Sequence, residues 1–316
     1  MARIVVALGG NALQANPKDI SAEAQLQTAH HTAKAIVDLI EDGHEVIIAH
    51  GNGPQVGQIV ATYEMANSVN ENNPVMPFPE CGAMSQGYIG YHLQQAIREE
   101  MVRRNINKSI AAIVTQVVVD KNDPGFKNPT KPVGSFFTEE QAKKLMAEKG
   151  YVMKEDAGRG WRRVVPSPMP IDVVEKEIVK TLVEAGHVVI TVGGGGVPVI
   201  QKEDGALEGV AAVIDKDLAS EKIAEILDAD ELIILTAVEK VAINFNKPDQ
   251  KDLDTMTVEE AKKYMEEGHF APGSMLPKVK AAVMFAESKE GRKAIITSLE
   301  KAREALKGLT GTVVTR

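Results

Sequence analysis

The sequence predicts an α/β fold in which helices cover both faces of a mainly parallel sheet. Short apolar runs rich in Val and Ile alternate with amphipathic stretches of helical length along the whole 316-residue chain. The apolar runs are continuous rather than alternating with polar residues, which is typical of strands buried on both faces. Strands that alternate with helices in this way form parallel sheets, because each helix returns the chain to the edge where the next strand begins.

The elements follow one another in a regular order. Strands are predicted at residues 3–8, 45–50, 109–117, 187–192, 211–214, 231–236 and 293–297. Helices are predicted at residues 22–41, 55–66, 86–104, 172–185, 217–227, 258–267, 276–287 and 300–306.

Residues 120–170 interrupt this alternation. They contain the only tryptophan, Trp161, and prolines 124, 129, 132 and 166, but few apolar runs. We predict a small subdomain that protrudes from the sheet, with a long surface loop as the alternative. A structureless loop of this length is uncommon in a compact domain unless it is functional.

Composition limits the classes of partner and compartment. The formal net charge of −8 argues against binding to nucleic acid or to an anionic membrane surface, since both need a broad basic face. Cys81 is the single cysteine, so no intrachain disulfide is possible, and we expect a cytoplasmic protein with a buried thiol. No apolar stretch approaches the length of a membrane span.

Glycine-rich turns follow three of the predicted strands. They are Gly9-Gly10-Asn11-Ala12, His50-Gly51-Asn52-Gly53-Pro54 and Gly193-Gly194-Gly195-Gly196. In a parallel sheet the three turns share the carboxyl edge, where ligands bind. Glycine lets backbone N–H groups approach a phosphate closely, so the first two turns predict phosphate contact. The third turn fits phosphate contact and simple turn geometry equally well.

Three lysines occupy unusual local settings. Lys131 lies between Pro129 and Pro132, which restrict the backbone around it. Lys216 lies at a strand end and helix start, next to Asp217, which is either a helix cap or a functional carboxylate. Lys278 opens another helix, where the helix dipole disfavours a cation, and a bound anion would offset that cost. Taken singly, each lysine could also be an ordinary surface group.

Seven motifs, in this order along the chain, resemble those of carbamate kinases, which belong to the amino acid kinase family. They are Ala7–Ala12, His50–Gly57, Cys81–Gly87, Asn128–Gly134, Asp156–Arg162, Asp215–Ala219 and Gly268–Lys278. The resemblance implies a single amino acid kinase domain over residues 1–316. It also implies a three-layer αβα sandwich around a mainly parallel eight-stranded sheet, with residues 120–170 as a protruding subdomain, or lid, and a homodimer.

The same resemblance implies roles for individual residues. The expected catalytic residues are Lys131, Lys216, Lys278 and Asp217. The expected substrate- and phosphate-binding residues are Gly9, Gly10, Asn11, Gly51, Asn52 and Gly53. The nucleotide is expected at Asp215, Met275 and Lys278, with its base near residues 238–247.

The implied reaction is reversible phosphoryl transfer from ATP to carbamate, which gives ADP and carbamoyl phosphate. Carbamate already carries a negative oxygen, so no general base is needed, and the sequence shows no obvious one. Catalysis by positioning and electrostatics is therefore expected. Mg²⁺ is expected to be carried mainly by the nucleotide phosphates, without a protein metal cage.

Two alternatives are less well supported. Acetylglutamate kinases carry a lysine where this chain has Ala7, and the motif around Lys131 favours a carbamate kinase. A silent nucleotide-binding protein on the same fold would not need all three lysines and Asp217. The resemblance further suggests ATP synthesis during arginine or agmatine breakdown, although no residue determines the direction.

Overall fold

The largest element of the computed structural model, which describes residues 1–16, 19–156 and 158–316, is an eight-stranded sheet. Its strands are β1 (Arg3–Leu8), β2 (Glu45–His50), β3 (Ile110–Ala112), β9 (Val188–Ile190), β12 (Glu231–Thr236), β15 (Thr255–Thr257), β16 (Lys293–Ser298) and β17 (Thr312–Thr315). Their order is β15-β17-β16-β12-β1-β2-β9-β3. Every neighbouring pair is parallel except β16 and β17. The predicted mainly parallel α/β fold is confirmed.

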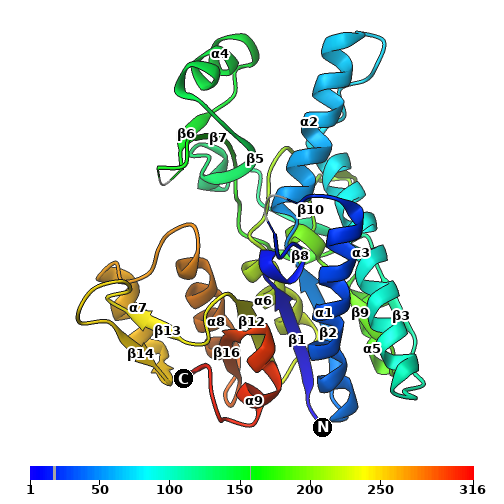
Figure 1. Cartoon of the computed structure of the whole chain (residues 1–316), viewed down its shortest axis with the longest axis vertical. Helices are drawn as coiled ribbons and strands as arrows, with labels where there is room; N and C mark the ends of the chain where they lie inside the picture. Colours follow the sequence, from blue (N-terminus) through cyan, green and yellow to red (C-terminus); the bar gives the residue numbers. More distant parts are fainter. Residues whose placement is uncertain (17–18, 157) are drawn as a thin grey trace.

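Helices cover both faces of this sheet (Figure 1). The helices of the chain are α1 (Ala22–Glu41), α2 (Gly53–Val69), α3 (Phe78–Arg103), α4 (Glu139–Lys149), α5 (Lys176–Glu184), α6 (Lys216–Ile226), α7 (Val258–Glu266), α8 (Met275–Ser288) and α9 (Ala302–Leu306).

Alternate residues of β1 are buried in two different cores. Ile4, Val6 and Leu8 pack in the core formed with α1 and α3, and Val5 and Ala7 pack in the core formed with α6 and α8. The result is the expected three-layer arrangement.

Three smaller sheets flank the main one. A four-stranded sheet has the order β11-β10-β4-β8, a hairpin joins β13 to β14, and a three-stranded sheet has the order β5-β7-β6. Their bounds are β4 (Gln116–Val118), β5 (Lys131–Phe137), β6 (Met153–Glu155), β7 (Trp161–Val165), β8 (Asp172–Val173), β10 (Val197–Gln201), β11 (Leu207–Gly209), β13 (Val241–Ile243) and β14 (Lys251–Leu253).

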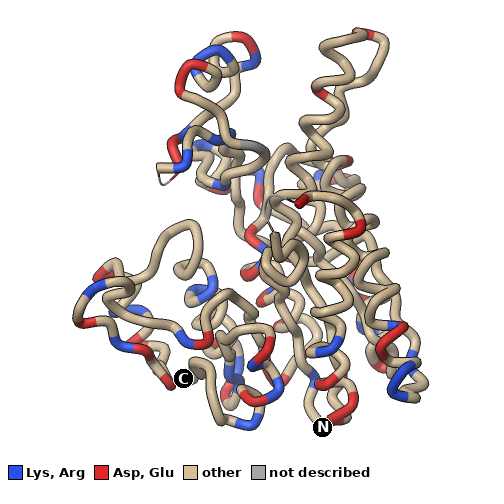
Figure 2. Tube along the Cα trace, viewed as in Figure 1, with Lys and Arg blue, Asp and Glu red and all other residues tan. Residues whose placement is uncertain are grey.

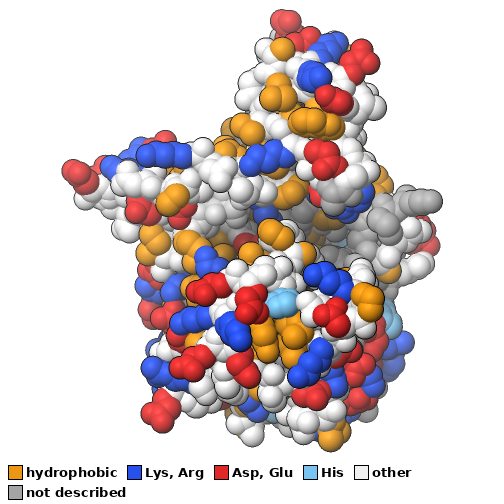
Figure 3. All heavy atoms as spheres, turned by 90° about the vertical axis from the view of Figure 1, so that its left-hand side faces the viewer, with side chains coloured by type: hydrophobic (Ala, Val, Ile, Leu, Met, Phe, Trp, Pro, Cys, Tyr) orange, Lys and Arg blue, Asp and Glu red, His pale blue; other side chains and the backbone are white. Residues whose placement is uncertain are grey.

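The sheet β5-β7-β6 and helix α4 form a unit that stands off the main body, beside the far end of α2 (Figure 1). We call these residues, 131–165, the projecting unit; they lie within the interval 120–170 that the sequence set apart. The surface is hollowed between the upper part of the molecule and the body below, and basic side chains lie at the edge of the hollow (Figure 3).

The strand predicted at 109–117 is wrong as a single element, because it divides into β3 and β4, which belong to different sheets. The division is at Thr115. Gln86 of α3 binds both backbone groups of Thr115: its Nε2 donates to Thr115 O at 3.0 Å, and its Oε1 accepts from Thr115 N at 2.8 Å. The backbone N–H of Thr115 thus pairs with a side chain rather than with a neighbouring strand, while its carbonyl also accepts from Val197 N of β10.

The strand predicted at 211–214 is also wrong, since these residues pair with no strand. Val213 is buried against Val56, Val133 and Val165, where the projecting unit joins the body. The segment is apolar because it packs at this junction, and burial alone does not distinguish such a segment from a buried strand.

Two helix starts differ from prediction by four residues or more. Helix α3 begins at Phe78 rather than at residue 86 and runs through Gly82, Gly87 and Gly90. A Cβ on Gly90 would lie 2.7 Å from Ala112 Cβ, so glycine is needed there for close packing of the helix against β3. Helix α5 begins at Lys176 rather than at residue 172, because Asp172 and Val173 form β8 instead.

Charged residues are mixed over the molecule. Figure 2 shows Lys and Arg interspersed with Asp and Glu along the trace rather than gathered on one side. Within the described part of the chain, no helix is both long enough and apolar enough to cross a membrane.

Candidate active site

The three glycine turns lie together at one edge of the main sheet. β1 and β2 are paired in parallel up to Leu8 and His50, and β2 is paired in parallel with β9. The chain therefore leaves these neighbouring strands on the same side. The first turn continues as a short 3₁₀ helix from Gly10, and the second leads into α2 at Gly53.

The third turn has a packing function. Gly194, Gly195 and Gly196 have φ angles of 66°, 91° and 81°, in the left-handed region that glycine tolerates. A Cβ on Gly194 would lie 2.2 Å from Asn52 Nδ2. Of the two readings that the sequence left open, close packing against the second turn is the one these contacts support.

His50 and Asn52 are held by contacts beneath the second turn. The buried His50 ring donates from Nδ1 to Gly51 O at 2.8 Å, and burial lowers the pKa of His50 to about 4. Asn52 Nδ2 donates to Ser85 Oγ at 2.9 Å. The support from His50 was missed by the sequence reasoning, although the position of this residue at a strand end next to a glycine turn was a usable signal.

The three lysines meet in space although they come from different elements. Lys131 Nζ of β5 lies 2.5 Å from Asp215 Oδ2, and Lys278 Nζ of α8 lies 2.9 Å from Asp217 Oδ2. Lys216 binds the other carboxylate oxygen of Asp217. Three ammonium groups and two carboxylates leave an excess of one positive charge at this point of an acidic protein.

Burial and neighbouring charges act in opposite directions on these groups. Asp217 is 2% exposed. Burial tends to raise its pKa, but the charges of Lys216 and Lys278 and their hydrogen bonds outweigh burial, and the pKa is lowered. Burial lowers the pKa of Lys216, with Asp217 acting against this effect. Asp217 therefore stays ionised and holds two lysines side by side.

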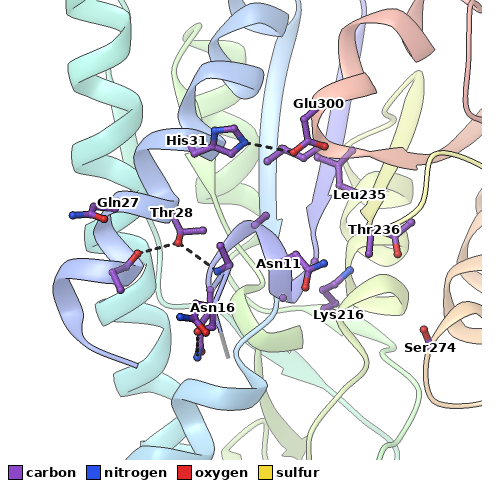
Figure 4. Close-up of a pocket in the computed structure, with 18 of the residues that line it drawn as sticks. Asn11, Asn16, Gln27, Thr28, His31, Lys216, Leu235, Thr236, Ser274 and Glu300 are labelled. Carbon is purple, nitrogen blue, oxygen red and sulfur yellow. Dashed lines mark hydrogen bonds and ion pairs between the residues drawn. The ribbon is translucent and has the colours of Figure 1, made fainter. Parts of the chain in front are cut away.

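Two cavities meet at Lys216. The larger, of about 900 Å³, is lined by Gly9, Gly10, Asn11, Lys216 and Lys278, among others. Figure 4 shows Asn11, Thr236 and Ser274 around it together with Lys216. The smaller, of about 170 Å³, is lined by residues that include Gly10, Gly51, Asn52, Gly53, Lys131 and Lys216. Lys216 and Gly10 thus border both cavities.

The far wall of the larger cavity comes from α1 and from the segment after β16. His31 Nε2 lies 3.5 Å from Glu300 Oε1 across this wall (Figure 4). Thr236 and Ala237, directly after β12, also line the cavity. None of these residues was predicted as a site residue, although Thr236 lies at the end of a fourth parallel strand at the same edge, which is a usable signal.

Two of the residues expected at the nucleotide have defined contacts within the protein. Asp215 caps α6, since its Oδ1 accepts from Asp217 N at 2.9 Å, and it also binds Lys131. Met275 is the first residue of α8 and packs against the core. Neither is among the described residues that line the two cavities. Residues 238–240 and Ala242 help to line a separate hollow of about 370 Å³ with Phe245, Gln250 and Asp252.

The carboxylates at the site are engaged by lysines rather than arranged around a metal. Among the described residues, no group of three or more His, Cys, Asp or Glu side chains could hold a metal ion. Cys81 is buried, and burial raises the pKa of its thiol, which fits a structural residue.

The fold and the paired cavities define a phosphotransferase of the amino acid kinase class. The sequence model of the amino acid kinase family matches residues 2–298. A carbamate kinase of Clostridium perfringens is 62% identical over 314 residues, which cover 99% of this chain and all of that protein. The carbamate kinase-like protein YqeA of Escherichia coli is 59% identical and covers 99% of this chain and 98% of its own length.

A solved structure agrees with these sequence matches. Carbamate kinase from Giardia lamblia bound to AMP-PNP superposes with a TM-score of 0.91 at 43% identity, over 99% of this chain and 98% of that one. The chain belongs to the amino acid kinase family and, within it, to the carbamate kinases.

Proposed function

We propose that the protein catalyses reversible phosphoryl transfer between ATP and carbamate. The observation that carries this proposal is Lys216, which borders both cavities beside Asp217 and Lys278. A phosphoryl group that passes between ligands in the two cavities would cross at this lysine. The relatives named carbamate kinase supply the identity of the acceptor.

The cavities differ in size as the two substrates do. The larger cavity suits a nucleotide, and a relative is named as bound to AMP-PNP, an ATP analogue. The smaller cavity of about 170 Å³ suits carbamate, an ion of only a few atoms. Lys131 lies in the wall of the smaller cavity, where its charge would meet the carbamate or the carbamoyl end of the product.

The reaction needs no proton transfer. The carbamate oxygen attacks the γ-phosphorus, the bond from phosphorus to the β–γ bridging oxygen breaks, and ADP leaves with the electron pair. Two anions must first approach each other, and at ~4 Å two unit charges repel by about 4 kcal/mol at an effective dielectric of 20. The lysine cluster offsets this repulsion and stabilises the charge that spreads over the phosphoryl oxygens.

Mg²⁺ belongs to this proposal as a companion of the nucleotide. Both carboxylates near the phosphoryl path, those of Asp215 and Asp217, are bound by lysines. The phosphate oxygens are then the main ligands of the ion, which supplies further positive charge at the transferring group.

The glycine turns complete the proposed site. Gly9, Gly10 and Asn11 would contact the phosphates from one side, and Gly51, Asn52 and Gly53 would surround the acceptor from the other. A Cβ on Gly10 or Gly53 would meet no atom within 4 Å. The space beside both glycines is thus free for a ligand. Asp215 and Met275 would act on the nucleotide through Lys131 and α8 rather than from the cavity wall.

We extend the proposal to the biological setting. The protein would act in the cytoplasm, where a single buried thiol stays reduced, and would make ATP from carbamoyl phosphate during arginine or agmatine breakdown. It would act as a homodimer. Exposed apolar side chains on α3, namely Met84, Tyr91 and Val102, offer a surface for a second copy. The projecting unit would serve as a lid over carbamate, which is labile in water.

One assay tests the reaction. Protein, ADP, Mg²⁺ and carbamoyl phosphate are mixed, and ATP is measured with time. ATP formation that depends on both the protein and carbamoyl phosphate supports the proposal. Absence of ATP, together with ATP-dependent phosphorylation of acetylglutamate, would assign the protein to another branch of the family.

A further inference from the structure

The projecting unit contacts the body at a second place, away from Lys131. Glu64 lies on α2, about three turns after Gly53. It accepts a hydrogen bond from the Tyr151 hydroxyl and pairs with Arg163 Nη1 at 3.5 Å and with Lys149 Nζ at 3.4 Å. All three partners belong to the projecting unit. We call these four residues the α2 latch.

The contacts of the latch reinforce one another. The guanidinium of Arg163 lies over the Tyr151 ring, 3.8 Å from its centroid. Burial and the hydrogen bond to Glu64 raise the pKa of Tyr151 to about 12, so its hydroxyl remains a donor. Hydrogen bonds to a charged acceptor are stronger than neutral ones. The latch is therefore a specific attachment rather than a chance surface contact.

The latch is connected to Lys131 by a short path. Arg163 of β7 is paired with Val133 of β5, two residues from Lys131. The next residue, Gly134, lies so close to α2 that a Cβ on Gly57 would be 2.4 Å from Gly134 Cα. Helix α2 itself begins at Gly53, in the wall of the smaller cavity. Helix α2 thus connects the turn Gly51–Gly53, which lines the smaller cavity, with β5, the strand that carries Lys131.

The interface between α2 and the projecting unit is not closely packed around the latch. A cavity of about 310 Å³ lies between α2 and the projecting unit, lined by Val60, Met65, Phe137, Leu145 and the latch residues, among others. An interface with a cavity of this size lacks the contacts of a close-packed core. Its polar attachment is therefore expected to determine how the unit sits against α2.

We propose that Glu64 is a positioning residue for the reaction: through Tyr151 and Arg163 it fixes the projecting unit against α2 and so holds Lys131 at the smaller cavity. This inference rests on the proposed carbamate kinase activity. Glu64 itself touches neither cavity at the lysine cluster and is not a catalytic residue. It acts through the placement of Lys131, where small displacements reduce turnover strongly.

Kinetics of the full-length protein test this role. Glu64→Ala is expected to lower kcat for ATP formation by about tenfold and to leave KM for ADP within twofold, because the latch shares no residue with the larger cavity. Glu64→Gln keeps an acceptor for Tyr151 and should lose less. Glu71→Gln, which removes an exposed carboxylate just beyond α2, is the matched control and should leave kcat unchanged.

Amide hydrogen exchange supplies a readout that is independent of activity. Residues 131–137 and 161–165 should exchange faster in Glu64→Ala and in Tyr151→Phe than in the control, while the strands of the main sheet keep their rates. Tyr151→Phe removes only the hydroxyl that binds Glu64, so this variant can be measured even if Glu64→Ala does not fold.

The outcomes separate this inference from the proposed function. Faster exchange with unchanged kcat, or lowered kcat with unchanged exchange, would overturn the positioning role. A wild-type protein that makes no ATP would overturn the proposed function and with it the catalytic part of this inference. Unchanged exchange in both variants would show that the latch does not hold the unit.

Discussion

Lys278 and Asp217 are 61 residues apart in the sequence, yet Lys278 Nζ lies 2.9 Å from Asp217 Oδ2. The other oxygen of the same carboxylate binds Lys216. Asp217 therefore places two cations side by side at the junction of the two cavities. Without a negative charge between them, the two ammonium groups would repel each other in a buried site.

Asp217→Asn should remove this charge while keeping the size of the side chain. Loss of one partner from a buried ion pair costs about 3–5 kcal/mol, and misplaced lysines should lower kcat by about 100-fold. Urea unfolding and the ATP-formation assay measure the two effects. Glu225→Gln, on the exposed face of the same helix, serves as the control, and equal losses in both variants would contradict the assigned role.

Lys131→Ala should abolish turnover while nucleotide binding survives. Lys131 lines only the smaller cavity of the two that meet at Lys216, so ADP should bind with a Kd within about twofold of wild type. Calorimetric titration with Mg²⁺ and ADP measures binding, and the coupled assay measures turnover. Lys127→Ala, at an exposed position outside both cavity walls, is the control. Near-normal turnover in Lys131→Ala would refute the role of this lysine.

Gly10→Ala should reduce activity while leaving the stability of the fold nearly unchanged. A Cβ at this position meets no protein atom within 4 Å, and Gly10 lines both cavities. Stability should change by less than about 1 kcal/mol, whereas the methyl group should reduce kcat/KM at least about tenfold by displacing a phosphate. Gly82→Ala, also with free space around it, tests the same substitution away from both cavities. Full activity of Gly10→Ala would show that no ligand approaches this glycine.

Glu221→Gln should change how stability depends on pH. Burial raises the pKa of Glu221 from 4.5 to about 7. Between these pH values the folded state holds a proton that the unfolded state releases, so this residue makes the protein less stable as pH rises from 4.5 to 7. The cost at higher pH is about 3 kcal/mol.

Urea unfolding of wild type and Glu221→Gln at pH 5 and pH 8 tests this expectation. The variant should gain stability relative to wild type at pH 8 and show little gain at pH 5. A difference between the two proteins that is the same at both pH values would contradict the raised pKa.

Six of the eight main strands coincide at least in part with strands predicted from the sequence, whereas β15 and β17 were not predicted. Each missed strand has only three or four residues, too few to show a clear pattern. The strand predicted at 211–214 failed because an apolar run also forms wherever a segment packs at a junction. The start of α3 was placed too late, at residue 86, whereas in the structure the helix begins at Phe78 and includes Gly82.

The α/β class, the three glycine turns and the identity of the three lysines could be predicted from the sequence, because they depend on local composition and on motifs that short segments carry. The tertiary structure alone shows which oxygen of Asp217 each lysine binds, that Asp215 binds Lys131, and that Glu64 contacts the projecting unit. Partners 61 to 87 residues apart are brought together by the packing of helices and sheets. Local sequence does not encode such distances.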